Sequence, residues 1–136
     1  MTEDLYHAAI VAAARRGADD RRLPSPARSA TVDNPLCGDR VTIDLDVTDG
    51  VVAAIGFRAR GCALCQASTA LLAEAAQGRP MAEVASGEQA VLVLLAEGAV
   101  PDGPWREFAA FAPVRRFPSR RDCVLLPFQA FRCAAP

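Results

Sequence analysis

The chain has 136 residues, of which 51% are hydrophobic and 23% charged, and its formal net charge is −1. These values predict a single globular domain over residues 1–136 and exclude a disordered chain. They also exclude a general electrostatic attraction to nucleic acid or to anionic membranes. No apolar run approaches the ~18 residues that span a bilayer.

The five cysteines indicate chemistry more than a disulfide framework. The N-terminus, Met1-Thr2-Glu3-Asp4, is acidic where a secretory signal would be basic. A cytoplasmic protein is therefore expected, in which thiols stay reduced. Cysteines in that compartment are typical of metal ligands or catalytic thiols.

The first half of the chain predicts one helix followed by a strand. The helix is expected over residues 3–16, before Gly17, and the polar segment 19–28 should be a linker. Apolar residues then alternate with polar ones over residues 41–48. One side of this strand should be apolar and the other, which includes Asp44, should face solvent.

A hairpin is expected to follow. Asp49-Gly50 is typical of a tight turn, and residues 51–60 should return with Ile55 and Phe57 pointing inward. Residues 29–33 can add a third strand. The predicted fold class is therefore α+β, with a small three-stranded antiparallel sheet that helices cover on one face.

Two helices are predicted directly after the hairpin. Residues 62–77 are apolar and alanine-rich, and Gly78 is a typical helix stop. Residues 86–89 (Ser-Gly-Glu-Gln) resemble a capping box, which predicts a second helix from there to Glu97.

The C-terminal part predicts a short helix over residues 105–110 and a last helix that begins at residues 119–122. Asp122 should satisfy early backbone donors of the last helix. Pro127 should kink or break it.

A candidate metal site begins in the segment Asn34-Pro35-Leu36-Cys37-Gly38-Asp39. Gly38 lets the backbone turn, so that Cys37 and Asp39 can approach one ion. Thiolates and carboxylates bind zinc, and thiolates also hold iron–sulfur clusters. Antiparallel pairing should bring these residues near Cys62. Cys123 would complete the set, and near helix N-termini both Cys62 and Cys123 should favour the thiolate.

Four anionic ligands around zinc would leave a charge of about −2, which requires nearby cations. Four arginines lie within three residues of a proposed ligand: Arg40, Arg60, Arg120 and Arg121. Two of them are expected to be solvated. Arg120 is the expected site arginine, because it precedes Cys123 by about one helical turn.

The sequence resembles the IscU/SufU iron–sulfur assembly scaffolds, which are related to the N-terminal domain of NifU. The matching segments are residues 34–39, residues 57–62 continuing into Gln66-Ala67-Ser68, and residues 117–123, in the same order and spacing over residues 5–131. The resemblance implies a SufE/NifU-like fold. It also implies that zinc is bound by Cys37, Asp39, Cys62 and Cys123.

The resemblance further implies a function. Cys123 would accept persulfide sulfur from a cysteine desulfurase of the SufS or IscS type. Cys37, Cys62 and Cys123 would hold a transient iron–sulfur cluster, such as a 2Fe–2S cluster, for downstream assembly or acceptor proteins. Such a protein is at most a sulfurtransferase-type acceptor and not an enzyme in the usual sense.

Two details favour the SufU branch, and others depart from the family. Asp122 replaces the histidine of IscU-type proteins, and the interval from Cys62 to Cys123 has room for the SufU insertion. Residues 15–20 replace the family's Pro-Arg-Asn segment, which puts the choice of partner in question. Cys65 stands where the family has serine or a similar small residue.

Two other functions fit the sequence. Cys62 and Cys65 form a C-x-x-C pair at a helix start, which is typical of dithiol redox proteins. Cys65 is instead expected to be a small buried core residue, and a spare thiol that replaces a ligand during transfer is a third option. A metal-free interaction module of the same fold is the other alternative. His7 is expected on the solvent side or rim, and Cys133 as a free thiol.

Overall fold

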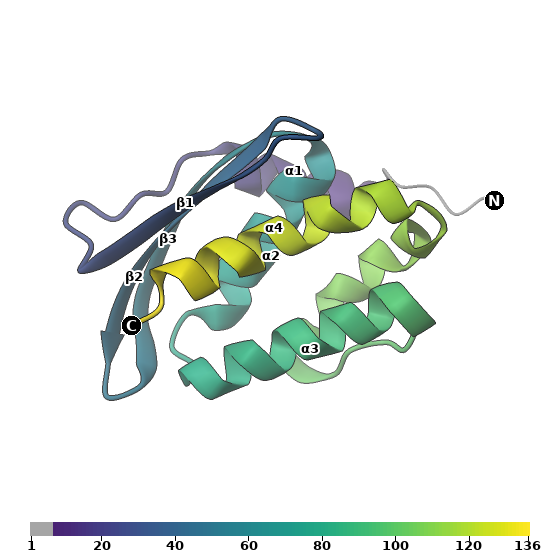
Figure 1. Ribbon diagram of the computed structural model, residues 1–136. Coiled ribbons are helices and arrows are strands. Elements are labelled where there is room, and N and C mark those ends of the chain that lie inside the picture. Colours follow the sequence, from purple (N-terminus) through teal and green to yellow (C-terminus); the bar gives the residue numbers. More distant parts are fainter. Residues whose placement is uncertain (1–6) are drawn as a thin grey trace.

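The computed structural model describes residues 7–136, so the predicted helix start at residue 3 lies outside the described residues. The three strands form one antiparallel sheet in the order β1-β2-β3, with helices on one face (Figure 1). This confirms the predicted α+β class. The elements are α1 (Ala8–Ala18), β1 (Arg28–Asn34), β2 (Asp39–Thr48), β3 (Val51–Arg60), α2 (Ala63–Ala76), α3 (Met81–Glu97), η1 (Gly103–Arg116) and α4 (Pro118–Ala134).

The β2–β3 hairpin has the predicted turn. Asp49 and Gly50 both have positive φ angles, 52° and 76°, as a tight hairpin turn with matching strand twist requires. The ladder closes at its other end with Arg40 opposite Arg60. Asp39 and Gly61 lie just beyond this last pair and are therefore neighbours. This places the two candidate ligand segments at the same end of the hairpin.

The side of β2 that was expected to face solvent is partly covered. Asp44 has a relative exposure of 0%, because the linker after α1 crosses this side of the sheet and pairs with β3 at Phe57. Arg22 of the linker donates two hydrogen bonds to Asp44, of 2.6 and 3.0 Å, and Leu23 N donates a third of 3.1 Å. Burial alone would raise the pKa of Asp44, but these bonds and one from Ser29 lower it.

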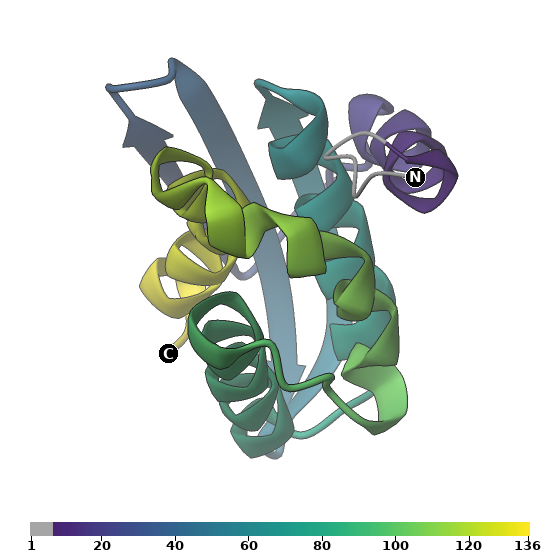
Figure 2. The same cartoon turned by 90° about the vertical axis from the view of Figure 1, so that its right-hand side faces the viewer.

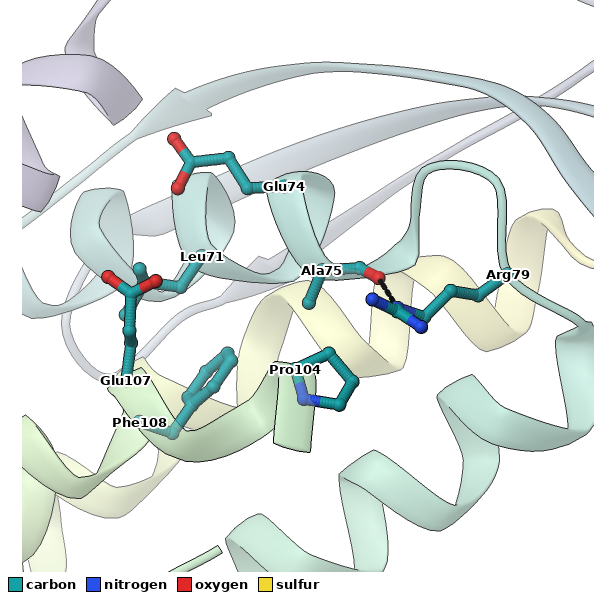
Figure 3. A pocket seen from close by; sticks show the side chains of 7 residues that line it. All are labelled: Leu71, Glu74, Ala75, Arg79, Pro104, Glu107 and Phe108. Carbon is teal, nitrogen blue, oxygen red and sulfur yellow. Dashed lines mark hydrogen bonds between the residues drawn. The ribbon is translucent and has the colours of Figure 1, made fainter. Parts of the chain in front are cut away.

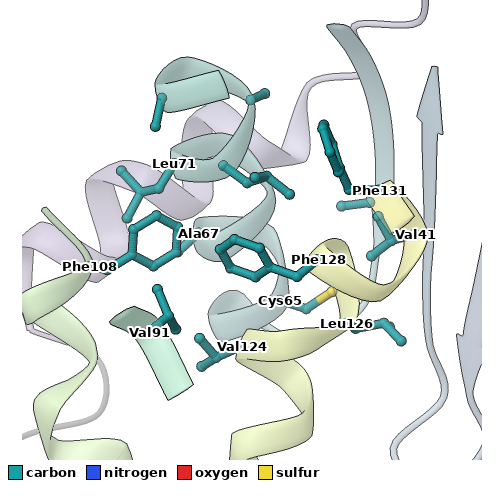
Figure 4. Packing of buried hydrophobic residues seen from close by; sticks show 14 of the residues in the cluster. Val41, Cys65, Ala67, Leu71, Val91, Phe108, Val124, Leu126, Phe128 and Phe131 are labelled. Atoms are coloured by element: carbon teal, nitrogen blue, oxygen red, sulfur yellow. The ribbon is translucent and has the colours of Figure 1, made fainter. Parts of the chain in front are cut away.

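The helices form two layers over the apolar face of the sheet. α2 and α4 lie directly on the strands, α1 packs against α2, and α3 packs against η1 farther from the sheet (Figure 2). Between them lies the hydrophobic core, in which Phe108, Phe128 and Val124 meet Val41 and Leu71 from β2 and α2 (Figure 4). Ile55, expected to point inward, is only half-buried, whereas Phe57 is 4% exposed.

The predicted helix ending at Glu97 is present, but its predicted start at a capping box is wrong. α3 begins five residues earlier, at Met81, with Pro80 as its N-cap, and it runs through residues 86–89 to the αL residue Gly98. A Cβ at Gly87 would collide with the Trp105 ring. Gly87 is therefore a point of close helix packing and not part of a cap.

The last helices also differ from the predictions. Residues 103–116 form a 3₁₀ helix in place of a short helix at 105–110. α4 begins at Pro118 with Phe117 as N-cap and has no acidic residue in its first turn, so Asp122 does not cap it. Pro127 is buried within α4 and does not end it. A proline inside a helix donates no backbone hydrogen bond, and its ring disturbs the carbonyls of the preceding turn, so these carbonyls need other partners. One of them, Val124 O, accepts a 2.6 Å hydrogen bond from the Ser68 hydroxyl.

We expect Asp44→Asn to lower the free energy of unfolding at neutral pH by about 1–3 kcal/mol, because a charged acceptor of several hydrogen bonds is lost. Since the folded-state pKa of Asp44 is lowered, its contribution is present above the unfolded pKa of about 3.9 and is lost as the pH falls through the folded value. The difference between wild type and variant should therefore shrink below pH ~4. Urea unfolding as a function of pH measures it, and a pH-independent difference would contradict this account.

Candidate metal centre

The β1–β2 loop folds the first candidate ligand into a tight turn. Gly38 N donates to Asn34 O (2.8 Å), and the Asn34 side chain accepts from Leu36 N (3.1 Å). Gly38 has a φ of 74°, a conformation that L side chains rarely adopt. The turn between Cys37 and Asp39 therefore requires a glycine at position 38, as the sequence predicted.

Asp39 is the second candidate ligand, and it is only 2% exposed. Its Oδ1 accepts the backbone N–H of Cys62 (3.0 Å), and its Oδ2 lies 3.6 Å from Cys62 Sγ. A Cβ at Gly61 would collide with this carboxylate. Gly61 therefore permits the close approach of β2 to the start of α2, a role that the sequence analysis did not assign.

The four predicted ligands come together at one end of the sheet. The possible ligand atoms of Cys37, Asp39 and Cys123 all lie within 4.8 Å of one another. Cys123 Sγ is 3.7 Å from Cys37 Sγ, and Cys62 joins the group through its contacts with Asp39. Three segments distant in sequence thus supply three sulfurs and one carboxylate, a group that could bind a metal ion.

The thiols of Cys62 and Cys123 differ sharply in acidity. A hydrogen bond from Cys123, together with the N–H groups of Cys65 and Leu64 at the start of α2, lowers the pKa of Cys62 to about 6. Hydrogen bonding to Cys62, burial and nearby negative charge raise the pKa of Cys123. The expectation that Cys123 gains thiolate character from a helix N-terminus is wrong, because it lies in the second turn of α4 and is fully buried.

Access to the group is one-sided. Cys37 is exposed, Cys62 is half-buried, and Cys123 has a relative exposure of 0%. Leu36, next to Cys37, is 91% exposed. The β1–β2 loop therefore forms the outer edge of the group, and Cys123 lies at its inner end.

The remaining cysteines and the histidine lie apart from this group or behind it. Cys65 has a relative exposure of 0% and points into the core (Figure 4), and burial raises its pKa. Such a thiol is a poor partner in a dithiol redox pair with Cys62. Cys133 is exposed on the last turn of α4. His7 is half-buried and caps α1 by accepting from Ala9 N, while its Nε2 lies 2.9 Å from Ala110 O.

Two of the four nearby arginines are solvent-exposed and pair away from the thiols, as expected. Arg40 binds Asp33 and Arg60 binds Asp20. Arg121 donates to Arg115 O, and its buried Nε has no hydrogen-bond partner. Arg120 is half-buried in the first turn of α4, and its role as site arginine stays a prediction.

A separate cavity lies away from the thiols. It has a volume of about 170 Å³ and lies between α2 and η1, lined by Leu71, Glu74 and Phe108 among others (Figure 3). No candidate ligand lines it, and Arg79 at its edge is bonded to Ala75 O (2.8 Å). Chemistry at the thiols therefore does not need this cavity.

Comparison with known proteins identifies the family. The sequence profile described as NifU-like N terminal domain matches residues 16–101. This chain belongs to that family. It is 30% identical over 100 residues to the iron-sulfur cluster assembly scaffold protein IscU of Thermotoga maritima, covering 73% of this chain and 70% of that protein. It is 26% identical over 101 residues to the zinc-dependent sulfurtransferase SufU of Bacillus subtilis, covering 73% and 68%.

Two solved structures share the fold. The N-terminal NifU-like protein of Brucella abortus superposes with a TM-score of 0.88 at 32% identity, over 97% of this chain and 92% of that chain. A putative SUF-system scaffold protein of Fervidobacterium islandicum gives a TM-score of 0.87 at 22% identity, over 96% of each chain. Both IscU and SufU proteins are thus relatives, and the similarity does not separate the two branches. In the described part of the chain, no helix is long and apolar enough to cross a membrane.

We expect Gly61→Ala to displace the Asp39 carboxylate and so to weaken zinc binding roughly 10–100-fold, the usual effect of disturbing what orients a ligand. A competition titration with a chromophoric chelator measures the affinity. Gly87→Ala is the matched control, because its added Cβ would also cause a collision, but between α3 and Trp105 of η1 and not at a candidate ligand. The control should lose stability but keep its affinity for zinc. Equal losses of affinity in both variants would contradict the assigned role of Gly61.

Proposed function

We propose that this chain is a zinc-binding sulfur acceptor in iron–sulfur cluster assembly, which receives persulfide sulfur from a cysteine desulfurase of the SufS or IscS type. The observation that supports this most is the convergence of three thiols and one buried carboxylate. The scaffold and sulfurtransferase relatives support the same function.

The donor set fits zinc. Three sulfurs and one carboxylate oxygen match the ligand types and number of a tetrahedral site, and Cys37, Asp39, Cys62 and Cys123 would hold the ion. When bound, zinc would keep these thiols deprotonated. Asp39 favours a cation independently of the sulfurs, because a carboxylate that is only 2% exposed is costly unless its charge is compensated.

Sulfur transfer to this chain is a thiol–persulfide exchange. The acceptor thiolate attacks the terminal sulfur of the desulfurase persulfide, a new S–S bond forms, the old S–S bond breaks, and the desulfurase cysteine leaves as a thiolate. No electrons are needed from outside. Cys123 is the proposed acceptor, and its burial means that the loop bearing Cys37 must open before a persulfide can reach it.

The same thiols could then serve a cluster. Cys37, Cys62 and Cys123 offer thiolate ligands of the kind that hold iron–sulfur clusters. Our proposal therefore includes a transient cluster, such as a 2Fe–2S cluster, passed to downstream assembly or acceptor proteins. One relative is a cluster assembly scaffold and another is a zinc-dependent sulfurtransferase, so the relatives support a proposal with both sulfur acceptance and cluster assembly.

The proposed site predicts about one zinc ion per chain, since four donors complete one tetrahedral site. Metal analysis of the purified protein should show it, and Cys37→Ala, Cys62→Ala and Cys123→Ala should each lose most of it. Cys133→Ala is the control, because this thiol is exposed at the far end of α4. Full zinc content in the three site variants would refute the ligand assignment.

The proposed acceptor predicts where sulfur arrives. After incubation with a cysteine desulfurase and cysteine, peptide mass spectrometry under non-reducing conditions should find an added sulfur atom on Cys123. Cys123→Ser should abolish it, because a hydroxyl is not a sulfur nucleophile at neutral pH. A persulfide on exposed Cys37 that persists in Cys123→Ser would instead make Cys37 the acceptor. No added sulfur on any cysteine would contradict the proposed function.

A further inference from the structure

The outer face of the sheet, opposite the helices, contains a hollow that the metal centre does not use. Its volume is about 360 Å³. Val41 and Ala59 are fully buried against the helices. The residues that line the hollow alternate with them along β2 and β3, so the lining residues point away from the helices. The lining residues are Arg22, Thr31, Arg40, Thr42, Arg58 and Arg60.

The register of the sheet gathers these side chains. Thr42 of β2 pairs with Thr31 of β1 on one side and with Arg58 of β3 on the other. Arg40 and Arg60 form the next pair on this face of the sheet, toward the end of the hairpin. The hollow therefore has hydroxyls on its floor and guanidinium groups around its rim.

Three carboxylates accompany the four guanidinium groups of this hollow. Arg40 binds Asp33 (2.6 Å), and Arg22 binds Asp44 (2.6 Å). Asp20 serves two arginines, binding Arg60 at 2.7 Å and lying 3.5 Å from Arg58. One positive charge is thus left over, and Arg58 has the weakest partner.

The carboxylates differ in how easily an incoming anion could replace them. Asp44 is fully buried, so its pair with Arg22 forms a fixed, neutral wall. The side chains of Asp20 and Asp33 are 42% and 54% exposed. Such exposed ion pairs contribute little to stability, so both carboxylates can turn into solvent at little cost. The arginines on β2 and β3 are then available together.

The floor of the hollow adds a further donor. Thr31 Oγ1 and Thr42 Oγ1 lie 2.7 Å apart and share one hydrogen bond. Because each hydroxyl has a single proton, one of the two protons remains to donate into the hollow. Guanidinium and hydroxyl donors around one space match a ligand that has several acceptor oxygens, as a phosphate group does.

We propose that this arginine hollow binds a small phosphate-bearing ligand, held by Arg40, Arg58 and Arg60 above the Thr31–Thr42 hydroxyl pair. Its volume lies in the range of about 300–1,000 Å³ that is usual for small-molecule sites. The site lies on the face of the sheet opposite the core, but Arg40 directly follows the candidate ligand Asp39 in sequence. It does not rest on the proposed function of the thiols.

Binding can be tested on the zinc-loaded protein with inorganic phosphate, pyrophosphate and ATP as separate probes. At least one probe should bind saturably in calorimetry and shift the backbone amide resonances around Thr31, Thr42 and Arg58. Arg58→Met and, independently, Arg40→Met should each weaken binding roughly tenfold, because each removes charge-assisted hydrogen bonds. Arg106→Met, at an exposed position on η1, should leave binding unchanged.

The three probes distinguish the sources of the phosphate group. Binding of inorganic phosphate and pyrophosphate places recognition in the phosphate alone, whereas binding of ATP only places part of it in the nucleoside. Both results support the site if the arginine variants weaken them.

Other results would overturn the proposal. These are the absence of saturable binding for all three probes, equal binding by wild type and Arg58→Met, and amide shifts confined to another surface. Polyphosphates also chelate zinc, so a signal that Cys37→Ser removes and Arg58→Met retains reports metal extraction and would refute the site as well. The arginine variants should keep the zinc content and sulfur acceptance of the wild type, which separates this test from the test of the thiol chemistry.

Discussion

The hydrogen bond between the Asp39 carboxylate and the Cys62 backbone N–H is the contact on which the rest of the site depends. It ties the first residue of β2 to the N-cap of α2, and so joins the sheet to the helix that covers it. Gly61 leaves the space for it and Gly38 provides the turn that precedes it. Cys37 and Cys123 lie at the same point, since their possible ligand atoms are within 4.8 Å of an Asp39 oxygen, and α4, which carries Cys123, packs on both β2 and α2.

The thiols around this junction form a gradient of burial. An exposed thiol at the loop, a half-buried thiol with lowered pKa at the start of α2, and a fully buried thiol on α4 lie within a few ångströms of one another. The thiol that solvent reaches most easily, Cys37, is thus not the thiol with the lowered pKa, which is Cys62. From solvent, the loop thiol is reached first and the α4 thiol last.

Much of the fold and of the site was predictable because it depends on local patterns. Strand alternation and Asp49-Gly50 fix the hairpin, and the hairpin alone brings Asp39 to Cys62. Three of the wrong predictions concern residues whose partners are distant in sequence. Gly87 fits the Trp105 ring, Asp44 is covered by the linker, and Cys123 is buried by neighbours from other segments. No local window of sequence contains those partners.

The hydrogen bond from Ser68 to Val124 O fastens α2 to α4 one residue beyond Cys123. Cys62 and Cys123 are therefore carried by two helices that are bonded to each other, and Asp39 is tied to the first of them through Cys62 N. Of the four candidate ligands, Cys37 is the one that lies in a turn, outside every helix, strand and helix cap. Its position therefore depends on the turn that Gly38 closes and not on the hydrogen bonds of a regular element.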